Sequence, residues 1–159
     1  MKARIVEEPL SIEEAYRALD DRRSGGVALF VGRVRPDPTD AGPTRALWYE
    51  AHRRLAEVEL DRLAARARRR FRTRRLLVWH RVGRVSVGEA SVIVGAAAAH
   101  RAPALAAVRW LITELKRSAP IWKQAPPRAR RAVPRRVTGE GSSPRAPHPR
   151  RGSAARRRP

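Results

Sequence analysis

The composition of the chain changes abruptly after Gln124, and this change limits which residues can fold. Residues 125–159 hold 11 Arg, one acid (Glu140) and 7 of the 13 Pro, but no Leu, Ile, Phe, Tyr or Trp. Such a segment cannot bury enough apolar surface to offset the entropy lost on folding. We therefore predict one folded domain in residues 1–124 and a disordered basic tail in residues 125–159.

The net charge of +21 is typical of proteins that bind nucleic acid or another polyanion. Residues 125–159 contribute +10 of it, and residues 1–124 contribute +11, from 25 Lys and Arg against 14 acids. The predicted tail has no aromatic residues on which bases could stack. A basic nucleic-acid-binding protein that acts through its Arg-rich tail nevertheless stays one of two functional alternatives.

Missing residue types exclude several kinds of site. The chain has no cysteine, which excludes disulfides, cysteine-ligated zinc, iron–sulfur clusters and a cysteine nucleophile. The four histidines do not follow metal-ligand spacing. No apolar run approaches the roughly 20 residues of a membrane span, and the N-terminus does not resemble a signal peptide. We expect a cytoplasmic protein with no metal site and no resident cofactor.

Hydrophobic patterns within residues 1–124 predict an α+β domain. Strands are expected at 3–6, 27–34, 44–52, 76–82 and 90–97, and helices from the capping box Ser11-x-x-Glu14 to about Asp20, at 53–71, and from near Pro103 to Arg117. Because the strands come in adjacent pairs, this order favours α+β over a doubly wound sheet.

Lysine is rare in this chain, which has 33 Arg but only Lys2, Lys116 and Lys123. Arginine keeps its proton near neutral pH, whereas a desolvated lysine can lose it and then act as an acid–base group or a nucleophile. The apolar segment 120–122 directly precedes Lys123 and could lower the pKa of that amine. Lys116 and Lys123 are therefore candidate catalytic residues; the alternative is that both are solvated surface lysines.

Basic residues at the ends of predicted elements are candidates for anion binding. His100 and Arg101 open the last predicted helix, where free N–H groups favour anions. Arg33-x-Arg35 follows a buried strand and precedes a Pro-rich loop. For both sets ordinary surface polarity is the alternative. For His80–Arg81 a structural role is favoured, and the Arg cluster at 66–75 is most simply a solvated helix face and turn.

Five segments of this domain resemble one family in the family's own order. They are Phe30–Arg35 (F-V-G-x-V-R), Leu47–His52 (similar to L-E-Y-E-A-Y), His80–Gly83 with Val87–Glu89 (H-R-x-G and x-G-E), His100–Arg101 (H-R) and Leu115–Lys123 (L-K-x-x-x-P-I-W-K). These motifs are typical of the catalytic (large) subunit of molybdopterin synthase, the MoaE family. The resemblance covers roughly residues 3–124.

The resemblance implies a fold, a reaction and partners. The fold would be an α/β hammerhead with an additional antiparallel β subdomain. The enzyme would be a sulfurtransferase of molybdenum cofactor biosynthesis. It would convert cyclic pyranopterin monophosphate into molybdopterin with sulfur from the C-terminal glycine thiocarboxylate of a small ubiquitin-like subunit. A homodimer of the large subunit would form the centre of a heterotetramer.

Site roles are also implied by the resemblance. Lys116 would lie beside the incoming thiocarboxylate, and Lys123 would assist proton transfer or bind the pterin intermediate. Arg35, His100 and Arg101 would bind the phosphate and the pterin, across a dimer interface in one arrangement.

The C-terminus departs from the family pattern. Members usually continue after W-K with a charged residue, Glu and a short closing segment, which the Arg/Pro-rich stretch after Gln124 replaces here. In the family this closing segment would help to complete the pocket and to dock the small subunit, so its replacement affects both. It is also what a frame shift in a GC-rich gene would produce, and an intact family-like C-terminus in another reading frame of the coding DNA would support that hypothesis.

Overall fold

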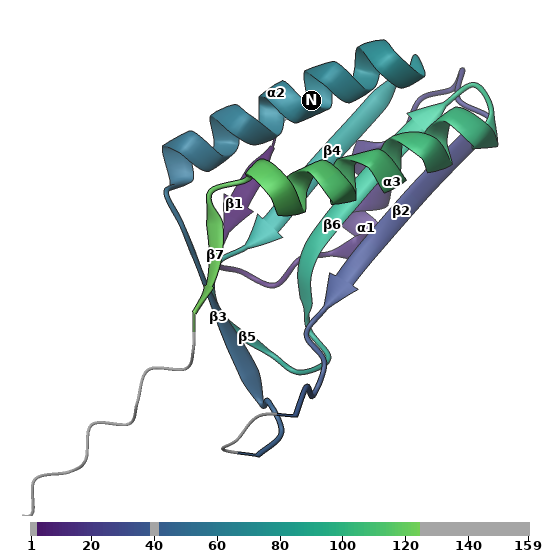
Figure 1. Ribbon diagram of the computed structural model, residues 1–159. Helices are drawn as coiled ribbons and strands as arrows, with labels where there is room; N and C mark the ends of the chain where they lie inside the picture. Colours follow the sequence, from purple (N-terminus) through teal and green to yellow (C-terminus); the bar gives the residue numbers. More distant parts are fainter. Residues whose placement is uncertain (1–2, 39–41, 125–159) are drawn as a thin grey trace, which may run out of the picture. The chain divides into compact units, whose positions relative to one another are not determined.

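The computed structural model describes residues 3–38 and 42–124, so the predicted tail at 125–159 lies outside the described residues. The elements in chain order are β1 (Arg4–Val6), α1 (Ile12–Ala18), β2 (Gly26–Arg33), β3 (Ala46–Ala51), α2 (Arg53–Phe71), β4 (Arg75–Arg81), β5 (Gly83–Ser86), β6 (Ala90–Ala98), α3 (Arg101–Ser118) and β7 (Ile121–Gln124). The prediction of an α+β domain is confirmed (Figure 1). The division into residues 1–124 and 125–159 stays a prediction.

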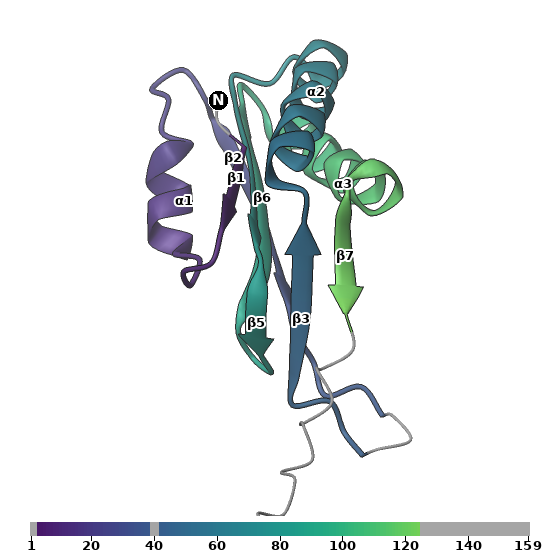
Figure 2. The same cartoon turned by 90° about the vertical axis from the view of Figure 1, so that its left-hand side faces the viewer.

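A four-stranded sheet with the order β1-β4-β6-β2 forms the centre of the domain. Strand β1 runs parallel to β4, and the other pairs are antiparallel. Helices α2 and α3 cover one face and α1 covers the other (Figure 2). Because side chains alternate along a strand, Val78 of β4 packs on the α2–α3 side, whereas its neighbour Trp79 packs with Leu19 on the α1 side.

A second, wholly antiparallel sheet has the order β5-β3-β7 and extends from one end of the first (Figure 1). It confirms the additional antiparallel subdomain that the family resemblance implied. Strands β5 and β7 were not among the predicted elements, because each has only four residues and shows too little alternation. Both form because β3 offers a hydrogen-bonding edge on each side.

The two ends of α2 also differ from simple expectation. His52, predicted as the end of a strand, is instead the N-cap of α2, where its Nδ1 accepts a hydrogen bond from the N–H of Leu55 at 3.4 Å. At the other end Arg72 terminates the helix with φ 52° and ψ 38°, a left-handed conformation that usually belongs to Gly or Asn.

Of the helices in the described ranges, none has the length and apolar character to cross a membrane.

Candidate functional site

Lys116 and Lys123 lie at the C-terminal end of α3, on the two sides of a tight connection. Lys116 is in the last turn of the helix, where the helix dipole favours a cation. The N–H of Ala119 bonds to the carbonyl of Leu115 at 3.1 Å, and the N–H of Ile121 bonds to that of Ala119 at 2.8 Å. The chain thus turns at once from α3 into β7, which brings both exposed lysines to one end of the helix.

The register of β7 determines what surrounds Lys123. Lys123 pairs with Tyr49 of β3, and Trp122 pairs with Glu50. Because alternate residues of a strand face opposite sides, Trp122 points away from the face that carries Lys123 and Tyr49. Trp122 is also 53% exposed. Of the apolar segment 120–122 that precedes Lys123, Ile121 therefore shares the face of Lys123, whereas Trp122 does not.

Tyr49 connects the second sheet to the first through a buried histidine. Its ring meets that of His80 edge-on, with 5.2 Å between centroids. The Nδ1–H of His80 donates to the carbonyl of Arg81 at 2.8 Å, and burial lowers the pKa of His80 below its ordinary value. The imidazole is therefore held neutral as a packing group at the junction of the two sheets, as the predicted structural role requires.

Arg81 and Glu89 brace the same junction. The Nε of Arg81 donates to the carbonyl of Glu7 at 3.0 Å, and its Nη1 lies 3.1 Å from Oε2 of Glu89. That carboxylate also accepts the N–H of Ser86 at 2.7 Å. The bond from Ser86 and the Arg81 charge hold the pKa of Glu89 below its ordinary value. These contacts connect β4 to β5 and so stabilise the position of the second sheet, β5-β3-β7, which carries Lys123 on β7.

The buried His80 predicts a pH dependence of stability. Its pKa in the folded state lies below the unfolded value of 6.5, so the unfolded chain binds the extra proton more readily. The contribution of His80 is complete above about pH 6.5 and is lost as the pH falls from there through the folded-state pKa. We expect the melting temperature to fall less between about pH 7.5 and pH 5 in His80→Gln than in the wild type. An equal fall in melting temperature in the two proteins would contradict this account.

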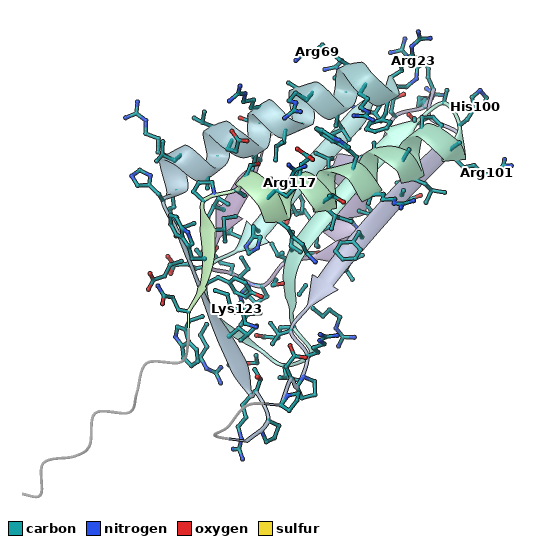
Figure 3. The ribbon with its side chains drawn as sticks, in the orientation of Figure 1. Arg23, Arg69, His100, Arg101, Arg117 and Lys123 are labelled. Carbon is teal, nitrogen blue, oxygen red and sulfur yellow. The ribbon has the colours of Figure 1, made fainter. Side chains whose placement is uncertain are left out.

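His100 and Arg101 lie at the opposite end of α3 (Figure 3). His100 is the N-cap, but its side chain makes no capping hydrogen bond. Both side chains are exposed. The first-turn N–H groups and these two side chains lie close enough in the chain to serve one anion, and anion binding at this end of α3 stays a prediction.

Gly26 lets β2 approach the start of α3. A Cβ on this residue would stand 2.8 Å from the backbone N of Arg101 and 2.9 Å from the carbonyl C of His100. Backbone atoms cannot rotate away, so Gly26→Ala should displace the helix start and lower the free energy of unfolding by about 1–3 kcal/mol in urea titrations. Val27→Ala, at the neighbouring exposed position, is the control and should change it by less than about 0.5 kcal/mol. Equal effects of the two changes would show that the close approach is unimportant.

Arg35 follows β2 at the end of the sheet away from His100. Strand β2 pairs Gly26 with Ala98 near the start of α3 and Arg33 with Ala90 at its far end. The Nε of Arg35 lies 2.6 Å from Oδ1 of Asp37, and its side chain is 82% exposed. An exposed pair of this kind contributes about 0–1 kcal/mol, so an anionic ligand could replace Asp37 at little cost.

The predicted site residues therefore form separate groups within one chain. Lys116 lies fifteen positions after Arg101 in α3, about 22 Å along the helix axis. The two lysines share one end of α3, whereas His100 and Arg101 share the other. Within residues 3–38 and 42–124, no three His, Cys, Asp or Glu side chains gather to form a metal-binding group.

Sequence reasoning missed Tyr49 as the residue opposite Lys123. The alternation of the predicted strand at 44–52 indicates that Tyr49 shares a face with Leu47, but it does not reveal the partner strand. Only the pairing of β3 with β7 brings Tyr49 and Lys123 together. Gly26 was likewise missed, because its role depends on the approach of α3 and not on its neighbours in sequence.

Comparison with known proteins shows which family the chain resembles. A family model described as "MoaE protein" matches residues 5–118. A molybdopterin synthase catalytic subunit from Pyrococcus abyssi is 35% identical over 125 residues, which are 77% of this chain and 84% of that protein.

Solved structures are similar as well. The crystal structure of molybdopterin synthase from Staphylococcus aureus aligns with a TM-score of 0.72 at 28% identity, over 76% of this chain and 87% of that one. A complex of subunits 1 and 2 of molybdopterin-converting factor from Helicobacter pylori 26695 aligns with a TM-score of 0.65 at 23% identity, over 76% and 82%. At that identity the likeness to the complex shows the fold alone.

Proposed function

This chain belongs to the MoaE protein family of molybdopterin synthase catalytic subunits, and hence to molybdenum cofactor biosynthesis, and from this premise we propose that it transfers sulfur to a phosphorylated pterin. The substrate is cyclic pyranopterin monophosphate, and the product carries the dithiolene of molybdopterin. The observation that supports this proposal most is the pair of exposed lysines at the α3–β7 junction, each inside a segment typical of the family.

The sulfur donor lies outside this chain. The chain contains no cysteine, so it has no thiol of its own that could carry a persulfide. The small ubiquitin-like subunit, with a thiocarboxylate on its C-terminal glycine, supplies the sulfur. Membership of the MoaE family supports a partner of this kind.

The two lysines have distinct tasks in this proposal. The ammonium group of Lys116 pairs with the incoming thiocarboxylate and orients it. Lys123 moves protons to or from the pterin intermediate, or binds it. It does so from the second sheet, whose position Tyr49, His80 and Arg81 stabilise. An arginine could supply the charge at either position but could not exchange the proton.

The phosphate-binding end of the site comes from a second copy of the chain. The roughly 22 Å between Arg101 and Lys116 is longer than a phosphorylated pterin, so one chain cannot engage the substrate with both ends of α3. A two-fold axis across the middle of α3 would place His100 and Arg101 of one subunit beside Lys116 of the other. Exposed apolar residues on this side, Phe30 on the edge strand β2 and Leu105 on α3, suit such a homodimer.

The nucleic-acid alternative receives no support from the relatives and structures described above. It still makes a separate prediction, since binding through residues 125–159 would weaken steeply with salt and would not depend on Lys116 or Lys123. Sulfur transfer would depend on both lysines and would survive removal of residues 125–159.

A bacterial strain that lacks its own large subunit tests the proposed function. Expression of this chain should restore the activity of a molybdenum-dependent enzyme in that strain. No restoration should occur in a strain that also lacks the small subunit, because the sulfur donor is then missing. A chain that accumulates in folded form without restoring activity in the first strain would overturn the proposal.

A further inference from the structure

The C-terminal end of α2 carries a basic depression that the proposed sulfur transfer does not use. It has a volume of about 710 Å³, and the residues that line it are Asp21, Arg23, Arg68, Arg72, Thr73, Arg74, Arg75 and Ala99. These residues come from the α1–β2 connection, the end of α2 with its turn into β4, and the segment that precedes α3. Arg23 projects from this end of the domain, far from Lys123 (Figure 3).

The basic depression has an excess of positive charge that its own carboxylate does not balance. Five arginines face one acid, Asp21. Asp21 pairs with Arg75, with 3.9 Å between Oδ2 and Nε. Within the described part of the chain, the other four guanidinium groups have no carboxylate partner. Like charges held this close repel one another, and a bound anion would relieve that repulsion.

Thr73 provides a second observation. It lines the basic depression and is only 4% exposed, yet its hydroxyl has no hydrogen-bond partner among the described residues. Buried hydroxyls are nearly always paired, because an unmade hydrogen bond costs free energy. The Thr73 oxygen is itself closed to solvent, so a small movement of the turn after α2 would have to open it before an anion oxygen could accept its hydrogen.

Arg72 provides a third observation that points to a ligand. It caps α2 in the left-handed conformation, where Gly would be less strained. Helix termination therefore gives no reason for a long cationic side chain at this position. The side chain instead adds a guanidinium group to the basic depression.

We propose that the basic depression binds a compact ligand with several adjacent phosphate groups. Guanidinium groups bind phosphate oxygens in a forked geometry, and arginine is well suited to this. Four unpaired guanidinium groups carry more positive charge than one phosphate can neutralise, whereas a run of phosphates can match it. Arg35, His100 and Arg101 do not line the basic depression, so its ligand would contact other side chains than the substrate phosphate does; Ala99, directly before His100, is where the two sites adjoin.

The test measures the melting temperature of the full chain with tripolyphosphate and with monophosphate at equal ionic strength. A ligand that prefers the folded state raises the melting temperature, and anion binding that persists in the unfolded chain does not. Tripolyphosphate should give the larger rise. Arg74→Gln should weaken its apparent affinity about tenfold, the loss expected for one charge-assisted hydrogen bond. Arg54→Gln, at the exposed start of α2, removes the same charge elsewhere and should leave the affinity unchanged.

Arg72→Gly separates binding from folding. The variant should melt at or above the wild-type temperature without ligand, because glycine tolerates φ 52°, while it binds tripolyphosphate more weakly and converts pterin normally. Equal tripolyphosphate affinity in Arg72→Gly, Arg74→Gln and Arg54→Gln would overturn the proposal. A rise in melting temperature with a single-stranded oligonucleotide but not with tripolyphosphate would also overturn the proposal and would indicate that the basic depression binds nucleic acid.

Discussion

Lys123→Ala should lower the rate of molybdopterin formation by about 10²–10⁴-fold, the range typical for loss of a positioned acid–base group. Lys123 is exposed on β7 and pairs through the backbone with Tyr49. Its side chain therefore adds little to stability, and the variant should melt within a few degrees of the wild type. Lys116→Ala should cause a loss of similar size. Single-turnover formation of product, with both subunits in excess over the pterin, measures the effect directly.

Two further variants show whether the amine or only its charge is required. Lys123→Arg keeps the positive charge but cannot exchange a proton near neutral pH, so its rate should stay close to that of Lys123→Ala. Arg117→Ala removes an exposed cation directly after Lys116 and should leave the rate nearly unchanged. Recovery of the rate in Lys123→Arg would reduce the role of Lys123 to electrostatic binding.

Mixed dimers should recover activity from two inactive variants. Lys123→Ala alone and the double variant His100→Ala with Arg101→Ala alone are both expected to be inactive. In a mixed dimer, one of the two composite sites takes its lysines and its His100–Arg101 pair from unaltered halves. Random pairing of equal amounts should therefore restore about a quarter of the wild-type sites. Co-expression of the two chains with different tags, followed by the conversion assay, measures this fraction.

The result discriminates between two arrangements of the site. If each site lay within one chain, every site in the mixed dimer would contain one defect, and no activity would return. The control is a mixture of Lys116→Ala with Lys123→Ala. If both lysines of a site come from one chain, every site of this mixed dimer contains one defect, and no activity returns. If they came from different subunits, one site would contain both defects and the other would contain neither. Recovery with this control mixture would contradict the assignment of both lysines to one chain.

The long elements of the fold were predictable from the sequence. Apolar residues of α2, among them Leu60 and Leu63, recur at helical spacing and are buried on the sheet. The short strands β5 and β7 were not predictable, because four residues carry too weak a pattern and their pairing depends on β3. His52 looked like the end of a strand because its role as a helix cap depends on the local backbone.

The candidate site shows the same division. The scarcity of lysine singled out Lys116 and Lys123, and the motif order singled out His100 and Arg101. The predicted helix from near Pro103 to Arg117 already placed these two pairs at opposite ends, and the structure confirms one continuous helix of about 22 Å between Arg101 and Lys116, which is the geometric reason for proposing a site shared between subunits. The sequence did not show that Trp122 turns away from Lys123, since the register with β3 decides this.

In vitro conversion tests the central proposal most directly. The full chain is mixed with thiocarboxylated small subunit and cyclic pyranopterin monophosphate, and molybdopterin and remaining thiocarboxylate are both quantified. The account predicts that molybdopterin forms and that two thiocarboxylates are consumed for each product, one for each dithiolene sulfur. A folded chain that binds the small subunit but yields no molybdopterin would contradict it.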